Sequence, residues 1–106
     1  MTVTPQVEIL LFEGCPNAEP ARELVERVAG DPGIVLEIHV VEVATPEAAD
    51  RTRFLGSPSI RVNGRDVEPG AEARTDFTLS CRVYRASSGL SGLPAEAWLR
   101  DMLRLG

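Results

Sequence analysis

Short apolar runs and one amphipathic pattern alternate along the first part of the chain. Val7 to Phe12 is almost continuously apolar, which is typical of a strand buried between other strands. Apolar residues then recur at the spacing of one helix face: Ala21, Leu24, Val25 and Val28. Ile34 to Val43 is a second apolar run, rich in β-branched residues. The order strand, helix, strand predicts a βαβ unit with parallel strands.

A short helix and a hairpin are predicted next. Thr45 is a good N-cap and Pro46 suits the first helical position. This helix is expected to run through about Phe54, with Gly56 as its stop. The dipeptide Asn63-Gly64 indicates a two-residue hairpin turn, because both turn residues must take positive φ. The turn would join two short strands: Ser59 to Val62 and Arg65 to Glu68.

The last third of the chain contains a long connection and a final helix. Gly70 to Leu93 has weak periodicity, and a structureless loop of this length is unusual in a compact domain. Its middle, Phe77 to Arg85, could form an additional strand. The final helix is predicted over Pro94 to Leu105, and its buried stripe comprises Trp98, Leu99, Met102 and Leu103.

Composition narrows the classes of function. The chain has 106 residues, the usual size of one domain, and 43% of them are hydrophobic, which is enough for a core. A net charge of -5 argues against general nucleic-acid binding, which needs clustered Lys and Arg. The first residues lack a basic segment and a long apolar core, and the apolar runs are too short to span a bilayer. We therefore expect a cytoplasmic protein without a nucleic-acid or membrane partner.

The junction after the first strand carries the strongest candidate chemistry. Gly14, Cys15 and Pro16 separate the apolar run from the helical pattern, so Cys15 lies at the tip of a strand and the mouth of a helix. Unpaired backbone N–H groups at a helix start carry partial positive charge and favour a thiolate. Two cysteines in a cytosolic chain suggest chemistry or metal binding more than a structural disulfide. We interpret Cys15 as a reactive or ligating thiol; the alternative is a small buried residue.

The other candidates also have structural interpretations. Cys81 is either a second functional cysteine or a core-facing residue of an alternating strand. Asn17 either lines the site or caps the helix, and Tyr84 with its Arg neighbours either contacts substrate or belongs to a solvated strand face. His39 has no Cys or His near it in the sequence, so a tetrahedral zinc site is unsupported. We expect no resident metal or cofactor.

The predicted order β-α-β-α-β-β-α, with Cys-Pro opening the first helix and Ser-Pro entering the third strand, resembles the thioredoxin-like superfamily. Cys15-Pro16-Asn17-Ala18 looks like its Cys-x-x-Cys motif with Ala18 in place of the second cysteine. Gly56-Ser57-Pro58 looks like its cis-proline loop. The resemblance spans nearly the whole chain and implies one α/β domain over residues 1–106. That domain would be a three-layer βαβ-α-ββ-α sandwich with a mixed four-stranded sheet and a long loop before the last helix.

The resemblance also implies thiol–disulfide exchange with a protein or small-molecule thiol or disulfide. Cys15 would be the reactive thiol, and the residue before the cis-proline would offer backbone hydrogen bonds to the substrate. The implied substrate ledge is formed by Ser57 and Pro58. Apart from the resemblance, Pro16, Asn17 and Tyr84 are further candidate substrate contacts. Ala18 removes the neighbouring cysteine that would resolve a mixed disulfide. Either Cys81 or an external thiol such as glutathione would have to take its place.

Two other functions stay open at this stage. Two thiolates at the rim of a loop suit soft ions such as Hg(II), Cu(I) or As(III), if Cys15 and Cys81 converge. A non-catalytic adaptor that kept the fold and lost the dithiol would also explain Ala18, and its partner would dock at an apolar cis-proline ledge.

Overall fold

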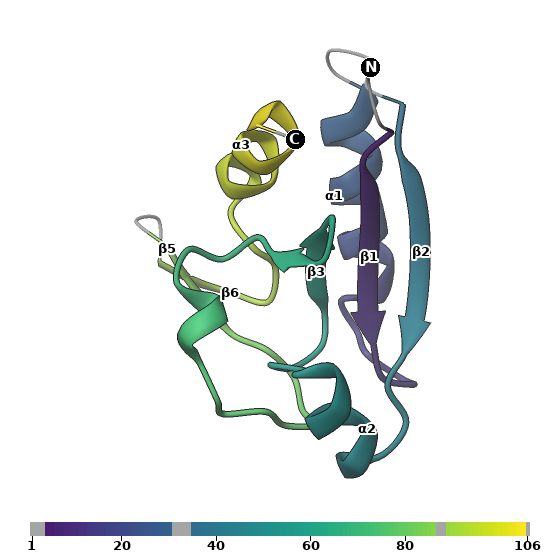
Figure 1. The fold of residues 1–106 in the computed structure, drawn as a ribbon, viewed down its shortest axis with the longest axis vertical. Helices are drawn as coiled ribbons and strands as arrows, with labels where there is room; N and C mark the ends of the chain where they lie inside the picture. The colour runs from purple at the N-terminus through teal and green to yellow at the C-terminus, as the bar shows by residue number, and fades with distance from the viewer. Residues whose placement is uncertain (1–3, 31–34, 87–88, 106) are drawn as a thin grey trace.

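The computed structural model describes residues 4–30, 35–86 and 89–105 of the chain. Over these residues it is a mixed α/β structure with a four-stranded mixed sheet, a separate two-stranded sheet and three α-helices (Figure 1). The elements are β1 (Gln6–Leu11), α1 (Ala18–Gly30), β2 (Glu37–Glu42), α2 (Pro46–Thr52), β3 (Ser59–Val62), β4 (Arg65–Asp66), the 3-10 helix η1 (Ala71–Ala73), β5 (Tyr84–Ala86), β6 (Gly89–Ser91) and α3 (Glu96–Leu105).

Strand β1 lies at the centre of the main sheet, whose order is β2-β1-β3-β4. It is parallel to β2 and antiparallel to β3, so that Ile9 is paired with Val40 on one side and with Ile60 on the other. The continuous apolar run of β1 reflects this position, because a central strand is covered on both faces. Figure 1 shows β1 and β2 running side by side toward α2. The predicted parallel βαβ unit is confirmed.

Alternate residues of β1 enter two different hydrophobic clusters. Val7 and Ile9 pack in the larger cluster with side chains of α1, β3 and α3. Leu10 packs in the smaller cluster with Val43 and with Ala49 of α2. Successive strand residues point to opposite faces, so α1 and α3 cover one face of the sheet and α2 covers the end of the other. This arrangement places the carboxyl end of β1 and the start of α1 beside α2 and the chain that follows it.

The local turn and cap predictions are confirmed where short-range chemistry decides them. The side chain of Thr45 accepts a hydrogen bond of 3.1 Å from the N–H of Ala48 and caps α2. Asn63 and Gly64 both have positive φ, at 50° and 86°, as the hairpin turn requires. The predicted end of α2 was wrong. The helix stops at Thr52, because Arg53 takes a left-handed conformation and its N–H bonds back to carbonyls of the helix.

Several predicted boundaries also change. Strand β2 covers only Glu37–Glu42 and forms an edge of the sheet with most of its side chains exposed; Ile34 lies outside the described residues. The hairpin's second strand is reduced to Arg65–Asp66, although the N–H of Val67 still reaches the carbonyl of Ile60 at 3.1 Å. The last helix begins at Glu96 and not at Pro94. Across the described ranges, no helix has the length and apolar character needed to cross a membrane.

The long connection has more structure than its sequence indicates. It contains η1 and the antiparallel β5–β6 hairpin, which lies on the far side of β3 from β1 (Figure 1). The additional strand expected within residues 77–85 forms only at Tyr84 and Arg85, and it continues to Ala86. The rest of that stretch forms no helix or strand, but the N–H of Thr78 donates to the carbonyl of Phe54 at 2.9 Å and Leu79 packs on the smaller cluster.

Packing of α3 on the sheet can be tested with a pair of leucines. Leu99 is 0% exposed within the larger cluster, whereas Leu90 on β6 is 66% exposed. Leu99→Ala is expected to lower the free energy of unfolding by about 2 to 5 kcal/mol, because it leaves a cavity in the core. Leu90→Ala should change it by less than about 0.5 kcal/mol. Urea denaturation measures both, and equal losses would contradict the observed packing of α3.

Candidate functional site

Cys15 lies in the tight turn between β1 and α1, as the sequence predicts. Its N–H donates to the carbonyl of Phe12 at 3.2 Å, and its own carbonyl accepts from the N–H of Ala18 at 3.3 Å. Gly14 precedes it with a φ of 85°, a conformation that glycine adopts without steric cost. Helix α1 begins at Ala18, so Cys15 precedes the helix by one turn of chain. The thiol is free and the residue is 8% exposed.

Ser57 connects this turn to the start of β3. Its buried hydroxyl oxygen accepts a hydrogen bond of 3.3 Å from the backbone N–H of Phe12, three residues before Cys15. The Ser57–Pro58 peptide bond is cis, and both residues are buried. On the other side of the proline, the hydroxyl of Ser59 donates to the carbonyl of Gly56 at 2.6 Å. The segment before β3 is therefore held from both sides and lies against the turn that carries Cys15.

Both backbone groups of Ser57 are occupied by the segment that contains Cys81. The N–H of Ser57 donates to the carbonyl of Ser80 at 2.8 Å, and the carbonyl of Ser57 accepts from the N–H of Arg82 at 2.9 Å. These bonds make an isolated parallel bridge between Ser57 and Cys81. These are the two groups that the family resemblance assigned to substrate binding. In this structure the chain's own second cysteine segment takes that place.

Exposed and buried side chains alternate around Cys81, and the cysteine is on the exposed side. Cys81 and Val83 are exposed, whereas Arg82 and Tyr84 are buried. The interpretation of Cys81 as a core-facing residue was therefore wrong. The interpretation of Arg82 and Tyr84 as part of a solvated face was wrong as well, and only Arg85 has the expected exposure. Cys81 is a free, solvent-accessible thiol on a segment that is fixed from its inner side.

The inner side of that segment is held by the guanidinium of Arg82, whose side chain is 1% exposed. Nη1 and Nη2 donate to the two carboxylate oxygens of Asp66 at 2.6 and 3.0 Å, in the fork geometry that suits a carboxylate. Nη2 also donates to Glu68 at 2.6 Å, and Nη1 donates to the hydroxyl of Ser59 at 3.0 Å. Burial opposes the charge of Arg82, but the hydrogen bonds of Asp66 and Glu68 together with nearby negative charge raise its pKa. The group stays a cation.

Gly56 allows the two segments to approach this closely. A Cβ atom at this position would lie 2.9 Å from Cβ and 3.0 Å from Cα of Arg82, which is closer than real Cβ contacts allow. Gly56 also has a φ of 117°, which side chains rarely tolerate. The sequence prediction gave Gly56 a role as a helix stop. Its observed role is to let the Arg82 backbone lie against the segment before Ser57.

Tyr84 closes the same arrangement from the hairpin side. Its hydroxyl donates to the carbonyl of Pro58 at 2.5 Å, and its ring lies 4.2 Å below the guanidinium carbon of Arg82. Burial raises the pKa of Tyr84 above its ordinary value, although the charge of Arg82 opposes this shift. Tyr84 was predicted as a substrate contact. It contacts the cis-proline segment of its own chain.

The remaining motif residues flank Cys15 on its helix side. Pro16 is exposed and Asn17 is partly buried. The loop after β6 packs directly on Asn17, since a Cβ atom at Gly92 would lie 2.3 Å from its Nδ2 atom. The long connection thus returns to this site twice, at Cys81 beside Ser57 and at Gly92 beside Asn17.

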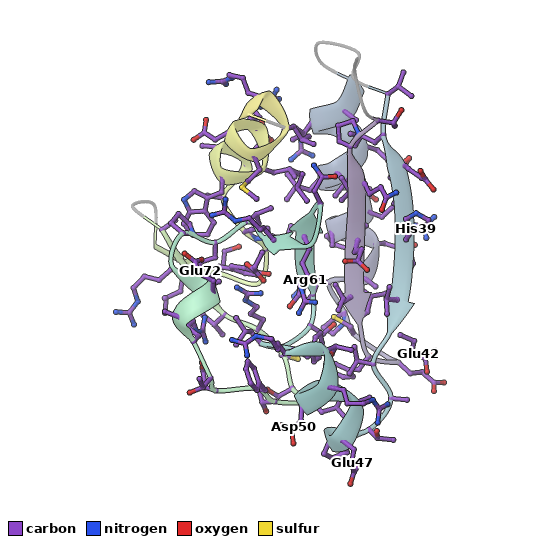
Figure 2. All side chains as sticks on the ribbon, in the orientation of Figure 1. His39, Glu42, Glu47, Asp50, Arg61 and Glu72 are labelled. Atoms are coloured by element: carbon purple, nitrogen blue, oxygen red, sulfur yellow. The ribbon has the colours of Figure 1, made fainter. Side chains whose placement is uncertain are left out.

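The described residues contain no cluster of three or more His, Cys, Asp or Glu side chains arranged to hold a metal ion. His39 lies on β2, where its Nε2 is 3.1 Å from a carboxylate oxygen of Glu37. Figure 2 shows His39 and Glu42 pointing outward from the edge of the sheet. The histidine is therefore part of an exposed surface pair.

Sequence reasoning found Cys15, Ser57 and Pro58 but missed the group that organises them. Arg82, Asp66 and Glu68 looked like ordinary surface charges, because no local pattern distinguishes a buried ion pair from an exposed one. The alternation at residues 79–85 was a usable indication of a strand-like segment. It did not say which of its two faces would be buried.

Comparisons with known proteins add no relative to this description. No protein-family model matches the chain, and no curated protein matches it.

Ionisation of the buried hydroxyl of Tyr84 tests the packing of the site directly. Tyr84 is the chain's one tyrosine, and the chain has no lysine, the other side chain that ordinarily titrates near pH 10. The pKa of Tyr84 is raised in the folded state, so the unfolded chain should lose this proton first as the pH rises past 10.0. The free energy of unfolding should then fall by about 1.4 kcal/mol per pH unit. Tyr84→Phe should remove that contribution. Tyrosinate absorbance and denaturant unfolding measure the effect, and ionisation of native Tyr84 near its ordinary pKa would contradict the packing.

Proposed function

We propose that the chain is a thioredoxin-like thiol–disulfide exchange protein in which Cys15 and Cys81 form an internal redox pair. The architecture supports this proposal. The mixed four-stranded sheet and the helices on both of its faces agree with the three-layer sandwich that the resemblance implies. The position of Cys15 between β1 and α1 agrees with it as well.

The single observation that carries the proposal is the contact of Ser57 with both cysteine segments. Its hydroxyl binds the Phe12 N–H in the turn of Cys15, and its backbone pairs with the segment of Cys81. One residue thus contacts the two segments that carry the free thiols, which are 66 positions apart in the sequence. A cysteine that approaches Cys15 from this side can replace the resolving cysteine that Ala18 removes.

The reaction proceeds in two exchange steps. The Cys15 thiolate attacks a disulfide RSSR, a bond forms between its sulfur and one R–S sulfur, and the other leaves as a thiolate. The Cys81 thiolate then attacks the Cys15 sulfur, which forms the Cys15–Cys81 disulfide and releases the second thiolate. The protein loses two electrons and two protons, and RSSR becomes two RSH. An external dithiol or two monothiols reverse the reaction.

The same geometry favours exchange over a non-catalytic adaptor. An adaptor would need the proline ledge as an open docking surface. Ser57 and Pro58 are buried, and both backbone groups of Ser57 are engaged by Ser80 and Arg82. The accessible feature at this position is the thiol of Cys81.

Oxidation with glutathione disulfide tests the internal pair. Intact mass and peptide mapping of the wild-type protein should show a Cys15–Cys81 disulfide and no lasting glutathione adduct. Cys81→Ser should accumulate a stable adduct on Cys15, because the resolving thiol is gone. Cys15→Ser is the matched control and should lose the internal disulfide. If Cys15 stays unmodified in both the wild type and Cys81→Ser, the proposed chemistry is ruled out.

A further inference from the structure

The strand-pairing position beside Cys15 is already filled by the protein itself. A peptide that binds by adding a strand needs a free N–H and a free C=O on the receiving edge. Ser57 has neither, because Ser80 and Arg82 bond to both at 2.8 and 2.9 Å. A protein disulfide would have to displace residues 80–82 before its own backbone could pair there. A small disulfide has no strand to place and requires only access to sulfur.

The buried side chain of Arg82 helps to hold residues 80–82 in this position. Its guanidinium makes four hydrogen bonds, to Ser59, Asp66 and Glu68, all on the β3–β4 hairpin or directly after it. The same residue donates the backbone N–H that reaches Ser57. Displacing the segment would therefore strip a buried cation of its carboxylate partners, which is among the most costly changes in a protein interior.

We propose that Arg82 is a positioning residue that locks the Cys81 segment onto Ser57 and thereby restricts the site to small-molecule disulfides, excluding protein strands. The proposal rests on the exchange function of Cys15 and Cys81 proposed above. The contact between the Cys81 segment and Ser57 then has two consequences. Cys81 is kept at one place relative to the turn of Cys15, which favours the intramolecular step. An incoming peptide is rejected because its backbone groups would remain unpaired.

The low exposure of Cys15 agrees with this substrate class. The residue is only 8% exposed, and the chain on either side of it is packed against Ser57 and against the loop at Gly92. A flexible small disulfide such as oxidised glutathione can bring its sulfur to such a position without burying a large surface. The opening does not need to accommodate an extended chain.

Arg74 offers a matched control for the side chain of Arg82. Both arginines bind the same carboxylate oxygen of Glu68, and both come from the long connection. Arg74 also pairs with Asp76, but none of its observed hydrogen bonds involves Ser57 or Cys81. Arg82→Lys and Arg74→Lys therefore make the same chemical change on either side of Glu68, and only the first removes the fork that holds the Cys81 segment.

The experiment compares two disulfides on the reduced protein and its variants. One is oxidised glutathione, and the other is a disulfide-linked unstructured peptide; rates of thiol oxidation are followed by acid quench and mass spectrometry. In the wild type, glutathione disulfide should react much faster than the peptide. Arg82→Lys should lower this preference by about tenfold, the size expected for losing one charge-assisted hydrogen bond. Arg74→Lys should leave the preference unchanged.

Two further readouts separate positioning from general destabilisation. Hydrogen exchange at the Ser57 and Arg82 amides should accelerate in Arg82→Lys and not in Arg74→Lys, while protection in β1 stays at the wild-type level. The equilibrium constant for forming the Cys15–Cys81 disulfide against glutathione should fall by about tenfold in Arg82→Lys. If Arg82→Lys does not fold, Asp66→Asn weakens the same fork while keeping Glu68, and the same shifts are expected from it.

The outcomes distinguish the two proposals. In the first outcome, the wild-type protein forms the internal disulfide, but a folded Arg82→Lys or Asp66→Asn variant keeps the same preference for glutathione disulfide and the same equilibrium constant for the internal disulfide. This result overturns the role of Arg82 and leaves the exchange function standing. A wild-type protein that oxidises the peptide as fast as glutathione overturns the assigned substrate class. A wild-type protein that forms no Cys15–Cys81 disulfide overturns the exchange function and this inference together.

Discussion

The arrangement of this site depends on one buried cation. A guanidinium removed from water is unfavourable unless carboxylates and hydrogen bonds replace its hydration. Asp66 and Glu68 supply the charge, and Ser59 supplies a further acceptor. These partners lie on the β3–β4 hairpin and just after it, so the requirement to neutralise Arg82 determines where the long connection must run. The position of Cys81 follows, because it is the residue next to Arg82.

Residues around this contact are adapted to it. Gly56 has no side chain where the Arg82 backbone approaches, and Tyr84 places its ring under the guanidinium and its hydroxyl on the carbonyl of Pro58. The segment before β3 is thus enclosed by the turn of Cys15 on one side and by residues 80–84 on the other. A connection with little regular structure becomes a fixed part of the site. The segments that carry Cys15 and Cys81 are therefore both in contact with Ser57.

Much of the main sheet could be predicted from the sequence, because its causes are local. The apolar run of β1, the helical spacing of α1, the cap at Thr45 and the turn at Asn63-Gly64 each depend on residues a few positions apart. The predictions failed where the cause was not local. The exposed edge position of β2 depended on which strand it paired with. Which side of residues 79–85 is buried depended on the carboxylates of Asp66 in β4 and Glu68 just after it, which bind Arg82. The end of α2 is the exception, because its cause is local: Arg53 takes a left-handed conformation that residues other than glycine rarely adopt.

The sequence by itself determined the order of the main-sheet strands and the three α-helices, the location of Cys15 between a strand and a helix, and the absence of a cysteine at position 18. These follow from short-range periodicity, capping and turn chemistry. Only the tertiary structure decided that Arg82 is buried, that Cys81 is exposed, and that Ser57 is paired with its own chain. The physical reason is that side chains along an extended segment alternate between two faces, and this alternation does not determine which face is buried. That choice is made by partners distant in sequence, here the two carboxylates that neutralise the cation.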